Sequence, residues 1–261
     1  IEALFSDGQI DNSRSAIRRA RSQGFDVSKL SDLEKKITTF SEHPHRPPST
    51  PPQQAIDSLL NAYQSGNYDI AEELAISKTQ RFPQDQLAWK ILGAILQQTG
   101  RGSESVGALQ TAVDLAPNDV ESHYNLGVTL QGLGRFEEAR ASYAKALALK
   151  PGFAEAHSGL GNVLQVTKRL EDAEKSYAQA VALKPGLVEA HYNRASTLKE
   201  LGRLEEAEDS YNQAIGLQPG FAEAHSNLGV VQQELGMLDE AVASFVEATR
   251  LQPNYAGAFY N

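Results

Sequence analysis

The sequence predicts an all-α fold, a solenoid of stacked antiparallel helix pairs, because three kinds of residue recur every 34 positions. Prolines mark the period, small residues follow it in columns of glycine and alanine, and aromatic residues form a further column. The proline column consists of Pro83, Pro117, Pro151, Pro185, Pro219 and Pro253. The aromatic column consists of Tyr143, Tyr177, Tyr211 and Phe245. Since one short unit cannot bury its own apolar face, the repeat predicts units that are stabilised by stacking on their neighbours.

Each unit is predicted to contain two helices. In the unit at 120–153, apolar residues at helical spacing predict a first helix over residues 121–133, which ends at Gly134. A second helix is predicted over residues 136–149, and Pro151 cannot continue it. The columns of small residues let neighbouring helices approach to roughly 8–10 Å. The sequence therefore predicts close helix packing within every unit.

Three segments carry a family resemblance. Residues 89–93 read WKILG, residues 133–139 read LGRFEEA and residues 149–151 read LKP. They closely resemble the tetratricopeptide repeat, or TPR. The resemblance implies that the helix pairs form a right-handed superhelix, and that its concave wall, lined by the first helix of each unit, is the ligand surface.

The chain is predicted to have three parts. They are a degenerate helical segment at 1–42, a proline-rich linker at 43–53 and the repeat array at 54–261. The array is predicted to comprise a weak unit at 52–85, full units at 86–119, 120–153, 154–187, 188–221 and 222–255, and a truncated unit at 256–261. Because this last unit stops within its first helix, we expect a longer parent protein.

Composition narrows the choice of partner and compartment. The net charge is −9 and the residues after position 51 carry a net charge of −10, so nucleic acids and anionic membranes are poor candidate partners. No apolar run is long enough to span a membrane. The chain contains no cysteine, which removes disulfides and thiolate metal sites. We expect a cytoplasmic protein, although a periplasmic location also fits, and a protein or peptide ligand.

A column of asparagines is the main candidate for ligand binding. The column runs Ile91, Asn125, Gly159, Asn193, Asn227 and Asn261. A carboxamide both donates and accepts hydrogen bonds, so it can pair with a peptide backbone running in either direction. A comparable asparagine ladder lines the repeat arm of the O-linked N-acetylglucosamine transferases, which this region resembles. The alternative is that each asparagine bonds a neighbouring helix and belongs to the fold. The sequence favours neither over the other.

Further polar residues are predicted to surround this column on the concave wall. They are Tyr124, Tyr192, Gln131, Asn162, Gln165, Ser196, Lys199 and Gln233. Tyrosine adds apolar contact area at a low cost in conformational entropy. Together with Asn125, Asn193, Asn227 and Asn261, they form the predicted peptide-binding set.

Other columns are assigned to the fold. Four histidines share a column with Trp89, and one repeat of separation is too far for two imidazoles to bind one metal, so packing is favoured and no metal site is expected. Those histidines are His123, His157, His191 and His225. Four glutamates begin the first helices of their units, and a favourable interaction with the helix dipole is the preferred interpretation over the steering of a ligand. They are Glu121, Glu155, Glu189 and Glu223. Arg194 stands in a leucine column, where it is expected to pair with an acidic residue.

The leading prediction for function is a protein-interaction scaffold that binds a polypeptide segment in its concave groove. One alternative is the substrate-recruiting arm of a larger enzyme of the glycosyltransferase, sulfotransferase or oxygenase type. Another is a self-assembling structural protein whose truncated C-terminal unit stacks on a second copy. None of the standard catalytic motifs is present, including HExxH, GxSxG and phosphate-binding glycine loops. The chain itself is therefore not expected to be an enzyme or to hold a cofactor.

Overall fold

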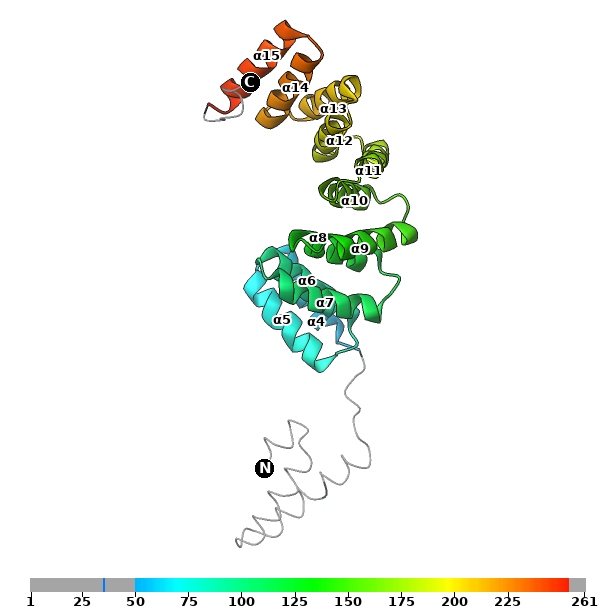
Figure 1. Cartoon of the computed structure of the whole chain (residues 1–261). Helices are drawn as coiled ribbons and strands as arrows, with labels where there is room; N and C mark the ends of the chain where they lie inside the picture. The colour runs from blue at the N-terminus through cyan, green and yellow to red at the C-terminus, as the bar shows by residue number, and fades with distance from the viewer. Residues whose placement is uncertain (1–34, 36–49, 254–261) are drawn as a thin grey trace. The chain divides into compact units, whose positions relative to one another are not determined.

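The computed structural model describes residue 35 and residues 50–253, and the helices in this part pack as successive pairs (Figure 1). From residue 53 on, the described helices lie in one compact unit. The helices of that unit are α4 (Gln53–Gln64), α5 (Tyr68–Arg81), α6 (Gln86–Gln98), α7 (Gly102–Leu115), α8 (Val120–Gly132), α9 (Phe136–Leu149), α10 (Ala154–Val166), α11 (Leu170–Leu183), α12 (Val188–Glu200), α13 (Leu204–Leu217), α14 (Ala222–Glu234) and α15 (Leu238–Leu251).

The described residues form an all-α solenoid, as predicted. Each even-numbered helix is the first of its unit and packs against the odd-numbered helix that follows it. The second helix then packs against the first helix of the next unit, which joins the pairs into a continuous stack. The two helices predicted in the unit at 120–153 match α8 and α9 to within one residue at each end. The weak unit at 52–85 forms α4 and α5. The predicted segment at 256–261 lies outside the described residues, and of the predicted segment at 1–42 only residue 35 is described.

The turn within each pair depends on a residue in the left-handed region of backbone space. Gly134 has a φ of +71°, and the Arg135 amide donates to the Leu130 carbonyl at 2.9 Å across this turn. This 6→1 bond is the one that ends a helix in a Schellman motif. Lys168 takes the same place in the unit at 154–187 with a φ of +59°, where a side chain is less easily accommodated. The 34-residue period thus fixes the reversal of the chain even where glycine is replaced.

In three of the described pairs the core is an aromatic ring laid against a glycine. Tyr143, Tyr177 and Tyr211 are almost fully buried, with at most 1% of their surface exposed. A methyl group added to Gly161 would come within 2.6 Å of the Tyr177 ring, so the glycine is what allows the ring to lie there. Ala195 occupies this glycine column opposite Tyr211, so one added carbon is tolerated in that unit. Close approach of helices therefore follows from the small-residue columns, as predicted.

Among the described helices, none has both the length and the apolar character required to cross a membrane.

Candidate functional site

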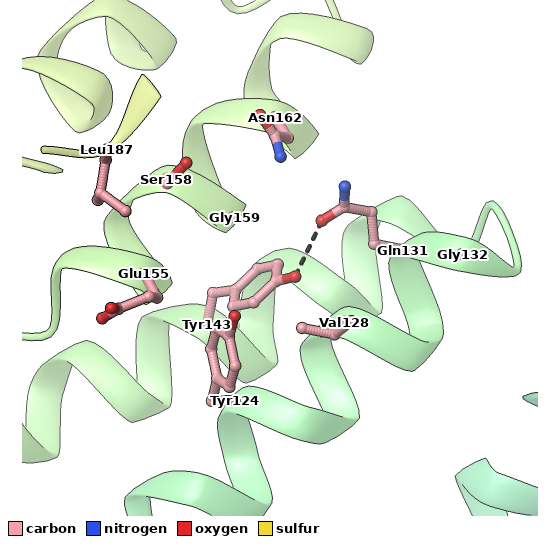
Figure 2. Close-up of a pocket in the computed structure, with 10 residues that line it drawn as sticks. All are labelled: Tyr124, Val128, Gln131, Gly132, Tyr143, Glu155, Ser158, Gly159, Asn162 and Leu187. Atoms are coloured by element: carbon pink, nitrogen blue, oxygen red, sulfur yellow. Dashed lines mark hydrogen bonds between the residues drawn. The ribbon is translucent and has the colours of Figure 1, made fainter. Parts of the chain in front are cut away.

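The first helices of two neighbouring units enclose a pocket of about 450 Å³. Helices α8 and α10 supply most of its lining, and α9 and the residue before α12 supply the rest. The lining residues are Tyr124, Val128, Gln131, Gly132, Tyr143, Glu155, Ser158, Gly159, Asn162 and Leu187 (Figure 2). Three of them, Tyr124, Gln131 and Asn162, belong to the predicted peptide-binding set. The structure thus brings these three predicted residues together around one hollow.

Two tyrosine rings form the aromatic part of this pocket. The centroid of the Tyr124 ring lies 4.9 Å from that of Phe153 and 6.0 Å from that of Tyr143. The Tyr143 hydroxyl donates to Oε1 of Gln131 at 2.9 Å, as the dashed line in Figure 2 marks. No hydrogen bond is made by the Tyr124 hydroxyl to any described residue. That hydroxyl therefore remains available to a ligand.

Glu155 is the one charged side chain among the residues that line the pocket. It accepts a hydrogen bond from Nζ of Lys184 at 2.8 Å, and this contact holds the pKa of Glu155 below its ordinary value. Burial, with a smaller contribution from the Glu155 charge, raises the pKa of Tyr124. At neutral pH the pocket therefore presents an ionised carboxylate beside a neutral phenol.

The asparagine column divides into two kinds of residue. Nδ2 of Asn193 donates to Oδ1 of Asn162 at 3.0 Å, and Nδ2 of Asn227 donates to the Tyr192 hydroxyl at 2.8 Å. These bonds join first helices of consecutive units, as the fold interpretation of the column expects. The half-buried Asn125 side chain has no hydrogen bond to any described residue, so it matches the ligand interpretation. Asn261 lies outside the described residues.

The other predicted groove residues also lie on first helices. Gln165 accepts from the Tyr177 hydroxyl at 3.0 Å, and Ser196 shares a 2.9 Å hydrogen bond with the Tyr211 hydroxyl. Lys199 is half-buried on α12 and Gln233 is exposed on α14. Gln165 and Ser196 thus bond buried tyrosines, which the sequence pattern did not indicate.

The histidine column has a structural role in the described units. A nitrogen of each ring lies within hydrogen-bond distance of the carbonyl of the proline six residues earlier, at 2.9 Å for His191 and Pro185. Trp89 makes the same bond to Pro83 at 2.9 Å. A ring at this position therefore fastens each first helix to the loop before it. Within the described residues, no group of three or more histidine or acidic side chains is arranged to hold a metal ion.

Arg194 pairs with an acidic residue, as predicted. Its Nε and a terminal guanidinium nitrogen lie 3.0 and 2.8 Å from Oε1 of Glu174. Arg203 approaches the other oxygen of Glu174 at 3.7 Å. Because Glu174 is on α11 and both arginines follow in the next unit, this ion cluster joins two units and is not part of the groove.

Several residues of the pocket are not among those predicted from the sequence. Tyr143, Val128 and Leu187 were not predicted, and Glu155 was assigned to the helix dipole. The signal that could have located the pocket was Gly159, because it interrupts the asparagine column. Gly159 leaves Tyr124 without an asparagine partner, although the Tyr143 ring takes the place of the missing side chain.

Four family models match the repeat region. Models described as tetratricopeptide repeats match residues 85–151, 124–188 and 222–255, and one described as a TPR repeat matches residues 196–236. No curated protein gives a significant match to the chain.

Solved structures of repeat proteins are similar to this fold. YrrB, described as a TPR protein with an unusual peptide-binding site, gives a TM-score of 0.64 at 21% identity over 72% of this chain and 97% of its own. PilF of Pseudomonas aeruginosa gives a TM-score of 0.70 at 18% identity over 79% of this chain and 94% of its own. MamA gives a TM-score of 0.60 at 26% identity over 63% of this chain and 96% of its own. With the four family models and the stacked helix pairs, these findings establish that the chain belongs to the tetratricopeptide-repeat family, whose fold is that of a protein-interaction scaffold.

Proposed function

We propose that the chain is an interaction scaffold that binds an extended polypeptide segment along the first helices of its units. The observation that carries the proposal is Asn125, a carboxamide on a first helix with no hydrogen bond to any described residue, which follows the pocket residue Tyr124 in the sequence. A carboxamide in that state can pair with a peptide group through both its donor and its acceptor. The peptide-binding site named for the similar fold of YrrB agrees with this assignment.

Replacing Asn125 by alanine tests this proposal. We expect the variant to bind a randomised peptide array about fivefold more weakly, because one hydrogen bond is worth about 1 kcal/mol. Its melting temperature should stay close to that of the wild type, since no bond within the chain is lost. Surface plasmon resonance with the peptides that bind best, together with thermal unfolding, measures both quantities.

The control is Asn212→Ala, the same change on the exposed side of the second helix α13. It should leave peptide affinity unaltered. Equal affinities of the Asn125→Ala and Asn212→Ala variants would contradict the proposal. Asn193→Ala is a less direct test, because it also removes the hydrogen bond to Asn162.

A second candidate function, self-assembly, is favoured by an apolar stripe on α15. Leu238, Val242 and Val246 are spaced four residues apart and are 61–62% exposed. In the two preceding units the position of Val242 is a glutamate that bonds the next first helix; for example, Glu208 accepts from Gln232 at 3.1 Å. The stripe is thus suited to a helix of a second copy.

The glutamate of the preceding unit suggests the variant that tests this second function. We expect the wild type to associate as its concentration rises, and Val242→Glu to remain monomeric, because a carboxylate on the stripe would be desolvated on association. Light scattering across a concentration series measures this. A wild type that is monomeric at every concentration would remove self-assembly and leave the peptide proposal untouched.

A further inference from the structure

The described residues contain two versions of the same arrangement of rings, 68 residues apart, and the two differ in whether an asparagine bonds the first tyrosine. Residues 151–158 and 219–226 are identical, and each segment is preceded by the same pair of tyrosines. The ring geometry is also repeated. The centroid of the Tyr192 ring lies 4.8 Å from that of Phe221 and 5.7 Å from that of Tyr211, close to the centroid distances between Tyr124 and its two neighbours.

The residue after each identical segment determines whether the first tyrosine accepts a hydrogen bond from the chain itself. At the later site it is Asn227, whose Nδ2 donates to the Tyr192 hydroxyl at 2.8 Å. At the earlier site it is Gly159, which has no side chain to reach Tyr124. A carbon added to Gly159 would come within 2.6 Å of Cζ of Tyr143, so the tyrosine ring extends to the glycine and forms part of the pocket wall. The glycine thus leaves the Tyr124 hydroxyl unpaired, while the Tyr143 ring takes the place that a side chain at 159 would occupy, so the pocket lies beside that place.

The lining indicates what kind of side chain this pocket accepts. The partly exposed Tyr124 ring, Val128 and Leu187 provide flat and apolar contact area, while Glu155 provides the charge. No lysine or arginine belongs to the lining itself, although Lys184 bonds one oxygen of Glu155 from outside it, and the chain as a whole carries a net charge of −9. An acidic guest would therefore be repelled, and a basic one attracted.

We propose that the hollow at Gly159 is a specificity pocket that takes an arginine side chain of the bound peptide. This inference deepens the proposed function and rests on it. A guanidinium is planar and can lie on a tyrosine ring, while its N–H groups donate to a carboxylate. Glu155 keeps one partner, Lys184, but a carboxylate has two oxygens and can accept further hydrogen bonds. The Tyr124 hydroxyl oxygen supplies another acceptor. The lysine ammonium is a compact and more strongly hydrated charge, so it would stack less well on an aromatic ring.

Gly132 offers a way to close the pocket without disturbing the fold. It is the last residue of α8 and lines the pocket, and a carbon added there meets nothing within 4 Å. Gly132→Trp should therefore place a large ring at the pocket while leaving the helix intact. Gly107→Trp is the matched control, because Gly107 lies on the second helix α7 and also has no neighbour within 4 Å.

The probes are three capped amino acids: N-acetyl-arginine methylamide, N-acetyl-norleucine methylamide and N-acetyl-glutamate methylamide. They are titrated into the whole chain while the tyrosine ring signals are followed by NMR. We expect the arginine probe to shift the signals of Tyr124 in the wild type and in Gly107→Trp, and to lose binding in Gly132→Trp. The norleucine and glutamate probes should bind more weakly to the wild type.

The charge assignment has its own pair of variants. Glu155→Gln should weaken the arginine probe about two- to fivefold, because it removes the carboxylate from beside the rings. Glu189→Gln makes the same change one unit later, in the same column but outside the pocket lining, and should leave binding unaltered.

The outcomes separate this inference from the proposed function. Arginine binding that survives Gly132→Trp, equal binding of the norleucine or glutamate probe, or no binding of the arginine probe would each overturn the arginine pocket. The proposed function would stand in each of these cases if the Asn125→Ala variant still loses affinity for the peptide array. If the array experiment fails while the arginine probe binds as expected, the pocket exists but does not act within a peptide groove.

Discussion

Tyr177→Ala is expected to destabilise the array by about 3–5 kcal/mol, because it empties a fully buried ring site between two helices. The cavity cannot close easily, since Gly161 opposite the ring has no side chain with which to fill it. The change also removes the hydroxyl that donates to Asn162 at 2.7 Å and to Gln165 at 3.0 Å. Urea unfolding followed by circular dichroism measures the loss.

Tyr177→Phe is the matched control for this prediction. Phe245 already occupies the same column in the last full unit, so a phenylalanine ring fits the site. This variant keeps the packing and loses only the hydrogen bonds, which are worth about 0.5–1.5 kcal/mol each. If Tyr177→Phe were as unstable as Tyr177→Ala, the hydroxyl and not the ring would hold the units together.

Asp85→Ala is expected to be similarly costly, because it leaves a buried lysine without its partner. Nζ of Lys78 lies 2.8 Å from Oδ2 of Asp85, and the two side chains are only 5% and 12% exposed. Removing one member of a buried ion pair typically costs about 3–5 kcal/mol. The measurement is again the free energy of unfolding in urea.

Lys78→Ala should behave in the opposite way. The equivalent residue in each full unit is alanine, for example Ala112 and Ala146, so the replacement restores the regular packing of the repeat. We expect a neutral or stabilising effect, and the double variant Lys78→Ala/Asp85→Ala should recover most of the stability that Asp85→Ala loses. An unstable double variant would mean that Asp85 acts through contacts other than Lys78.

The fold could be predicted from the sequence because it depends on period and side-chain size. Three columns each meet one requirement of a helix pair. The column of Pro151 ends the second helix, that of Tyr143 supplies the buried ring, and that of Gly127 leaves space for this ring. These requirements act within one unit or between adjacent units. They can therefore be deduced from spacing alone, and the helices α8 and α9 begin and end within one residue of their predicted bounds.

The site could be predicted only in part, because it depends on which neighbour each side chain chooses. Asn125 and Asn193 are the same residue in the same column, yet only Asn193 bonds the preceding unit. Asn193 can make this bond because Asn162 lies about one turn after Gly159, the member of the column in the preceding unit. The repeat pattern does not specify an asparagine at position 162. Lys78 illustrates the same limit, since a lysine in an alanine column becomes acceptable only where Asp85 can approach it.

Site-specific photo-crosslinking tests most directly whether first helices form the ligand surface. A photoreactive residue at Gln131 on α8 and one at Gln110 on the exposed side of α7 are compared, each with the same randomised peptide library. We predict that peptides are captured at Gln131 and not at Gln110. Equal capture at both positions, or capture at Gln110 alone, would contradict a peptide-binding groove on the first helices.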